Sequence, residues 1–183
     1  MRVIAGVAGG RRLAVPPRGT RPTSDRVREA LFAALEHGPG LAGATVLDLC
    51  AGSGALGLEA LSRGAAHALF VESDRRAAAV LRRNVDAVGL PGAVVRVAPA
   101  ATVLAGPAEQ AYDLLLVDPP YEVSGAEVAG WLAAAAANGW LADDALVVVE
   151  RSTHGPSFDW PPPLRSLRER RYGETVLHLG DRG

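Results

Sequence analysis

The sequence of 183 residues contains one cysteine and no lysine, because all nineteen basic residues are arginines. A single cysteine excludes an intrachain disulfide and a cysteine-based metal cluster, and we expect no metal site. The chain has no stretch of about 18 uncharged apolar residues, which excludes a membrane-spanning helix, and we expect no membrane partner. No apolar segment of the signal-peptide type follows Met1, so we expect a cytoplasmic protein.

The formal net charge is only −1, but the charges are distributed unevenly along the chain. Residues 1–40 hold seven arginines against three acidic residues, whereas residues 41–150 hold six arginines against thirteen acidic residues. A basic end beside an acidic middle is typical of a surface that meets a polyanion. A solvated basic face has the same composition, so the charge pattern alone leaves both interpretations open.

The middle of the chain alternates between short apolar runs, typical of buried strands, and segments with helical spacing. This order predicts an α/β fold in which a mostly parallel sheet carries helices on both faces. The predicted strands are residues 45–50, 68–71, 93–98, 112–117 and 145–150, and the predicted helices are residues 25–36, 55–63, 75–88, 100–105 and 126–137.

The two ends of the chain each predict an antiparallel hairpin around a glycine turn. The turns are Gly9-Gly10 near the start and Gly173-Glu174 near the end. The flanking runs are residues 2–6 and 11–15 in the first hairpin, and residues 164–172 and 175–179 in the second. We therefore expect two units, a basic hairpin with its linker over residues 1–22 and a main α/β domain over residues 23–183.

A glycine-rich turn follows the first strand of the alternating series. Gly52, Gly54 and Gly57 match the G-x-G-x-x-G spacing, which lets a ligand approach the backbone closely. This turn serves dinucleotides, which bring a pyrophosphate, and S-adenosylmethionine (SAM), which has no phosphate and carries a sulfonium and an ammonium. Asp48 before the turn would repel a pyrophosphate and attract an ammonium, which favours SAM. The alternative is that Asp48 only accepts hydrogen bonds from the turn amides.

Glu72 ends the next strand, about twenty residues after the glycines, where a carboxylate accepts the ribose hydroxyls of either ligand.

The tetrad Asp118-Pro119-Pro120-Tyr121 follows an apolar strand, at the edge where parallel sheets bind ligands. The prolines remove two N–H donors, so the turn offers only acceptors, and Tyr121 adds a ring on which a base can stack. Two acceptors on the exocyclic amino group of a nucleobase would free its lone pair and stabilise the charge that develops as a methyl group arrives. The alternative is an ordinary Pro-Pro strand exit with Asp118 as a helix cap.

These motifs carry a resemblance to a known family. The run Asp48–Gly54 is similar to motif I of the class I SAM-dependent methyltransferases, and Asp118–Tyr121 is similar to motif IV of the amino-methyltransferases that act on nucleic acid. The arginine-rich start narrows the resemblance to the bacterial 16S ribosomal RNA guanine-N2 methyltransferases of small-subunit type D. The runs that carry it are residues 2–6, 10–13, 21–32 and 56–65, together with Asn84 and Gly89-Leu90.

The resemblance implies a Rossmann-like class I methyltransferase fold, with a seven-stranded, mostly parallel sheet, an antiparallel last strand and a small N-terminal β-hairpin. It implies SAM as the cofactor, a guanine N2 of 16S ribosomal RNA as the methyl acceptor, and the small ribosomal subunit as the partner. We expect the protein to be a monomer. The implied catalytic residues are Asp118, Pro119, Pro120 and Tyr121. The implied cofactor-binding residues are Asp48, Ala51, Gly52, Gly54, Glu72, Ser73 and Thr23, and the implied RNA-binding residues are Arg11, Arg12, Arg21 and Arg26.

One segment departs from the usual pattern of the fold. An acid that binds the adenine amino group of SAM often follows the third strand, but residues 97–101 here read Val-Ala-Pro-Ala-Ala. Adenine recognition would then rest on backbone and packing. Two other functions stay open. The same tetrad serves an amino-methyltransferase for adenine or cytosine in DNA or another RNA, and the missing acid leaves open a non-catalytic RNA-binding assembly factor. Asp48 and the tetrad disfavour a third, a nicotinamide oxidoreductase.

Overall fold

The computed structural model describes residues 1–17, 23–155 and 157–183. The strands are β1 Thr45–Leu49, β2 His67–Glu72, β3 Ala93–Val97, β4 Tyr112–Val117, β5 Leu141–Ser152, β6 Leu164–Tyr172 and β7 Thr175–Arg182. The helices are α1 Asp25–His37, α2 Ala55–Ser62, α3 Arg75–Val88, α4 Ala100–Ala105 and α5 Gly125–Ala137.

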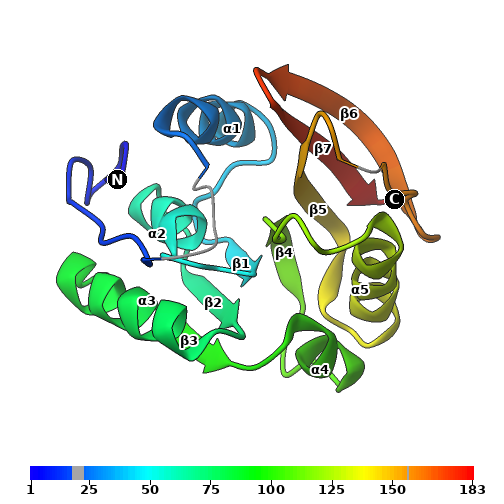
Figure 1. The fold of residues 1–183 in the computed structure, drawn as a ribbon, viewed down its shortest axis with the longest axis horizontal. Helices are drawn as coiled ribbons and strands as arrows, with labels where there is room; N and C mark the ends of the chain where they lie inside the picture. The colour runs from blue at the N-terminus through cyan, green and yellow to red at the C-terminus, as the bar shows by residue number, and fades with distance from the viewer. Residues whose placement is uncertain (18–22, 156) are drawn as a thin grey trace.

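The described residues form one seven-stranded sheet in the order β3-β2-β1-β4-β5-β7-β6 (Figure 1). The strands β1 to β5 run parallel, and β7 runs antiparallel to both of its neighbours, β5 and β6. The last strand of the sequence is thus the reversed one, which confirms the predicted fold class. Such a strand order reverses between β1 and β4, and open parallel sheets bind ligands at the carboxyl edge of that point.

Helices cover both faces of the sheet, with α1, α2 and α3 on one side and α4 and α5 on the other (Figure 1). Alternate residues of each central strand point to opposite faces, so the core consists of two apolar layers. In β1, for example, Val46 packs under α1 and α2, and Leu47 packs under α4 and α5. Because both faces are covered, the central strands are apolar almost throughout.

The predicted element boundaries agree with the structure to within a few residues, with two differences. The strand β5 begins at Leu141 and not at 145, because a register shift between Tyr112 and Leu114 lets the earlier residues pair with β4. The predicted N-terminal hairpin reduces to one isolated antiparallel bridge between Arg2 and Arg12.

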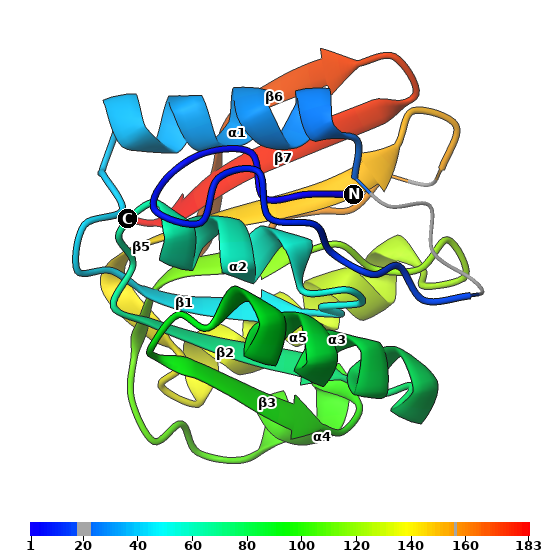
Figure 2. The ribbon, with the colours of Figure 1, turned by 90° about the vertical axis from the view of Figure 1, so that its left-hand side faces the viewer.

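Side chains of the main domain hold this N-terminal segment in place, where it passes over α2 (Figure 2). The buried carboxylate of Glu59 in α2 accepts hydrogen bonds from the amides of Ile4 and Ala5, at 2.8 and 3.1 Å. The side-chain amide of Asn84 in α3 pairs with both backbone groups of Ala14. These bonds bring residues 1–17 to the edge of the sheet where β1 ends.

Two helical glycines with different surroundings give a test of the packing. A Cβ at Gly57 in α2 would stand 2.4 Å from Cε1 of the buried Phe70, whereas a Cβ at Gly130 in α5 would meet nothing within 4 Å. We expect Gly57→Ala to lower the free energy of unfolding by about 1–3 kcal/mol through overpacking. The matched variant Gly130→Ala should raise it by about 0.5–1 kcal/mol through helix propensity. Urea denaturation of both variants measures these changes, and a harmless Gly57→Ala would contradict the packing described for α2.

Candidate functional site

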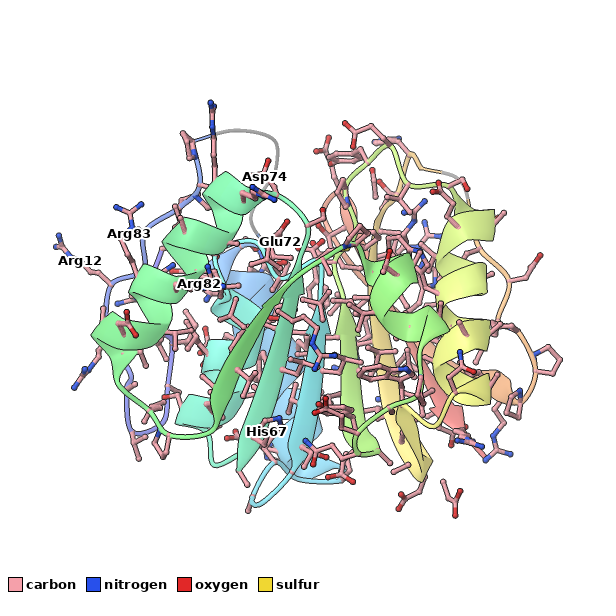
Figure 3. The ribbon with its side chains drawn as sticks, turned by 90° about the horizontal axis from the view of Figure 1, so that it is seen from below. Arg12, His67, Glu72, Asp74, Arg82 and Arg83 are labelled. Carbon is pink, nitrogen blue, oxygen red and sulfur yellow. The ribbon has the colours of Figure 1, made fainter. Side chains whose placement is uncertain are left out.

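The strand register places four polar residues in one row at the carboxyl edge of the sheet. Val71, Leu49, Val117 and Val149 are partners across β2, β1, β4 and β5. The residues that follow them are Glu72, Cys50, Asp118 and Glu150. Figure 3 shows the strands along their length, with Glu72 and Asp74 at one end of the sheet and His67 at the opposite end. Three carboxyl groups of the row therefore gather where the strand order reverses.

The described residues line two hollows at this edge. The larger, of about 670 Å³, is lined by residues 72–74 after β2, 98–101 after β3, and Trp131 of α5, among others. The smaller, of about 40 Å³, is lined by Thr23 and by the glycine turn from Ala51 to Ser53. Asp118 lines both hollows. The predicted cofactor residues Ala51, Gly52, Glu72, Ser73 and Thr23 are thus brought together around Asp118.

Gly52 and Gly54 have different structural roles in the turn. Gly52 has a φ of +56°, and a Cβ there would meet nothing within 4 Å, so its backbone faces open space. A Cβ at Gly54 would stand 2.4 Å from the side chain of Leu81, so this glycine lets the start of α2 pack closely on α3. Of the two predicted ligand-binding glycines, Gly52 lies open to a ligand and Gly54 shapes the turn.

Asp48 lies beneath the glycine turn and is 1% exposed. Its Oδ2 accepts a hydrogen bond of 2.9 Å from the amide of Gly57, as the structural alternative requires. Its Oδ1 is buried and has no hydrogen-bond partner in the part of the chain that the structure describes. Burial raises the pKa of Asp48 to about 7, against the lowering effect of the Gly57 amide, and the charge of Glu72 adds to the rise.

Glu72 is held by two backbone amides. Its Oε2 accepts from Gly52 at 2.7 Å and its Oε1 accepts from Asp74 at 2.9 Å. The carboxylate therefore links the glycine turn after β1 to the start of α3, where Asp74 caps the helix. Each oxygen keeps a further lone pair, and the residue lines the larger hollow, so it remains able to accept a hydroxyl.

Asp118 shares a hydroxyl with a residue that the sequence analysis did not select. Oγ1 of Thr23 lies 3.2 Å from Oδ2 of Asp118 and 2.5 Å from Oε2 of Glu150. Burial and the charge of Glu150 raise the pKa of Asp118 well above that of an ordinary aspartate, while the Thr23 hydrogen bond lowers it. Glu150 directly follows an apolar run, as Glu72 and Asp118 do, and this repeated sequence signal was enough to find it.

The other predicted catalytic residues lie around the hollows in different ways. Pro120 lines the larger hollow, while Pro119 and Tyr121 line neither. The Tyr121 side chain is 61% exposed. The ring is therefore free to contact a large molecule that approaches from solvent.

The predicted RNA-binding arginines differ in their freedom. Nη1 of Arg11 donates to the carbonyl oxygens of Ala87 and Val88, which anchors the N-terminal segment on the end of α3. Arg12 and Arg26 are exposed, and Arg21 lies outside the described residues.

Among the described residues, no group of three or more histidine, cysteine or acidic side chains is arranged to hold a metal ion. Their helices are too short or too polar to cross a membrane.

Comparison with known proteins agrees with this geometry. A family profile described as conserved hypothetical protein 95 matches residues 1–181. The ribosomal RNA small subunit methyltransferase D of Escherichia coli is 39% identical over 183 residues, which cover 100% of this chain and 90% of that protein. The chain belongs to this family. The resemblance found in the glycine turn, the tetrad and the arginine-rich start is thereby confirmed.

Solved structures support the fold of this family member. An Escherichia coli structure, 36% identical, covers 100% of this chain and 97% of its own with a TM-score of 0.86. A magnesium protoporphyrin IX methyltransferase from Synechocystis, solved with bound SAM, is 13% identical and has a TM-score of 0.67 over 86% of this chain and 79% of its own. The latter likeness concerns the fold alone.

The buried carboxyl of Asp48 gives a pH-dependent test. Its folded pKa of about 7 lies above its unfolded value of 3.8, so the folded state holds a proton between these values that the unfolded state has lost. The protonated Asp48 carboxyl therefore adds to the free energy of unfolding in acid, and this contribution is lost as the pH rises from about 4 to 7. We expect Asp48→Asn to be nearly neutral at pH 4 and stabilising by roughly 2–4 kcal/mol at pH 8. Urea denaturation at both pH values measures the difference, and an equal effect at both would contradict the raised pKa.

Proposed function

We propose that this protein is a SAM-dependent methyltransferase that methylates a guanine N2 in the 16S RNA of the small ribosomal subunit. The name of the family relatives supports the reaction and the class of substrate. The observation that carries the proposal is the acceptor-only tetrad beside the glycine turn, at an edge crowded with carboxyl groups. Such an edge suits a cationic methyl donor and an acceptor with N–H bonds.

The residues at the glycine turn fit SAM, which supplies a methyl group on an electrophilic sulfonium when it is bound. Asp48 has a buried oxygen without a partner in the described chain, and an ammonium or a water bound to it would satisfy that oxygen. Gly52 leaves room for close approach, and Glu72 has lone pairs left for ribose hydroxyls. Residues 98–101 and Trp131 line the rest of the larger hollow and offer packing to adenine in place of an acid.

The tetrad would act on the base. Asp118 and the carbonyl of Pro119 would accept the two hydrogens of the guanine amino group, which turns the nitrogen lone pair toward the methyl donor. Tyr121, exposed beside the hollow, would stack on the base once it has left its helix. After the transfer, Asp118 or water would take the proton that the nitrogen loses. Thr23, predicted to border the cofactor or the RNA, would act by holding Asp118.

Exchange of the Asp118 carboxylate for an amide tests this chemistry. We expect Asp118→Asn to slow methyl transfer by about 10²–10³-fold, because a donor replaces an acceptor at the amino group. Labelled methyl transfer from SAM to small subunits from cells without a family member measures the rate. Mass spectrometry of the nucleosides identifies the product.

The controls separate the competing functions. Calorimetry with S-adenosylhomocysteine should show that Asp118→Asn keeps its affinity for the cofactor product. Glu122→Gln, which removes an exposed charge four residues away, should retain the wild-type rate. Methylated adenine or cytosine in place of guanine would contradict the substrate assignment. A wild-type protein that neither binds nor transfers would instead support the assembly-factor alternative.

The arginines near α3 offer a surface for the RNA backbone. The Asn84 bonds hold the N-terminal segment along α3, and Figure 3 shows Arg12 on the same side of the molecule as Arg82 and Arg83. All three side chains are exposed, and none forms an ion pair within the described residues. We propose that they contact phosphates, and that Arg11 contributes by anchoring the segment.

The salt dependence of RNA binding tests this surface. Each lost phosphate contact lowers the slope of log K against log salt by about 0.7–0.9, so changing Arg12, Arg82 and Arg83 together to Gln should lower it by about 2–3. Filter binding of 16S RNA at several salt concentrations measures the slope. The matched triple change of Arg165, Arg168 and Arg171 on β6 should leave the slope near its wild-type value. An equal loss in both variants would show a general effect of charge and contradict the α3 surface.

A further inference from the structure

Asp118 and Glu150 occupy neighbouring register positions on parallel strands, and one hydroxyl joins them. Val117 and Val149 are partners in the ladder between β4 and β5, so the next side chains along both strands lie side by side. Oγ1 of Thr23 lies within hydrogen-bond distance of both carboxyl groups. The side chain of Thr23 is buried, and it precedes Ser24, which caps α1 and so fixes the place of the hydroxyl.

The Thr23 hydroxyl serves Asp118 and Glu150 unequally. A threonine hydroxyl carries one proton and donates it to one carboxylate at a time. The contact with Glu150 is the shorter one, at 2.5 Å against 3.2 Å for Asp118, so the hydroxyl donates mainly to Glu150. Asp118 therefore accepts the weaker of the two hydrogen bonds from Thr23, and it lies beside the negative charge of Glu150. Both conditions favour its neutral form.

We propose that Glu150 is a positioning residue for the methyl transfer, which sets the charge of Asp118 directly and through Thr23. The inference rests on the proposed function, because Asp118 can take the proton that the guanine nitrogen loses only when it starts as a carboxylate. Glu150 would thereby set the pH above which Asp118 is a carboxylate and the tetrad can support methyl transfer. It would touch neither the base nor the methyl donor.

Other groups also face Asp118. Asp48 of β1 and Cys50 after it approach from the other neighbouring strand, and Asp48 also disfavours the charged form of Asp118. The Asp48 carboxyl binds the Gly57 amide and shares no hydroxyl with Asp118 in the described chain. Glu150 is thus the neighbour that combines a negative charge with a hydrogen-bonded link.

The titration of Asp118 tests the proposal without turnover. Glu150→Gln keeps the size of the side chain and an oxygen that accepts from Thr23, but it removes the charge. We expect the pKa of Asp118 to fall by about one unit or more in this variant. Carbon-13 NMR of the labelled protein follows the carboxyl signal of Asp118 as the pH changes. The signal is assigned by its absence from the spectrum of Asp118→Asn. An unchanged pKa overturns the proposal.

Two further variants complete this titration. Glu122→Gln removes an exposed negative charge from the same loop and should leave the pKa of Asp118 unchanged, because solvent screens it. An equal shift in Glu122→Gln overturns the assignment to Glu150. If Glu150→Gln does not fold, Glu150→Ala supplies a second charge-free variant, which must lower the pKa in the same direction.

The pH dependence of kcat/KM on small subunits gives an independent measure. Its acidic limb should move to lower pH in Glu150→Gln by the same amount as the pKa of Asp118. Glu150→Asp, which restores the charge, should return the limb toward its wild-type position. A uniform loss of rate with no shift in the limb would assign Glu150 a structural role and overturn the proposal. Absence of methylation by the wild-type protein contradicts the proposed function alone, since the NMR titration needs no turnover.

Discussion

The crowding of carboxyl groups at one edge of the sheet is the constraint on which the site depends. Glu72, Asp118 and Glu150 follow register partners on β2, β4 and β5 and so lie at the same level, and Asp48 of β1 lies beneath them. In water such a group of like charges would separate, but the sheet register and the covered faces hold these side chains together. Backbone amides and one shared hydroxyl stabilise them, and burial raises the pKa values of Asp48 and Asp118.

The N-terminal segment completes this edge. Three side chains of the main domain, Glu59, Ser62 and Asn84, bind its backbone. The same segment carries Arg12 to the side of α3 and brings residues 15–17 to the hollows. A chain section without a named strand or helix is therefore held by polar groups in the helices together with a few backbone hydrogen bonds of its own.

The sequence predicted the order of strands and helices because each strand is apolar and each helix has a clear start or stop, such as Asp74 before α3 and Gly89 after it. It also located the glycine turn and the tetrad. It did not show that Arg11 is engaged with the end of α3, or that Glu150 shares a hydroxyl with Asp118, because both contacts join residues far apart in the chain. Spacing along a sequence reports local geometry, whereas the register between β4 and β5 appears only when the sheet is assembled.

The raised pKa values have a thermodynamic consequence for ligand affinity. Burial and neighbouring charges raise the pKa values of Asp48 and Asp118, so the free site binds protons on these groups more tightly than water-exposed carboxylates do. A cation that enters must compete with those protons, and its arrival expels some of them into the solvent. Occupancy of the edge is thus coupled to hydrogen-ion concentration, so the association constant of any positively charged ligand declines as the surroundings become more acidic.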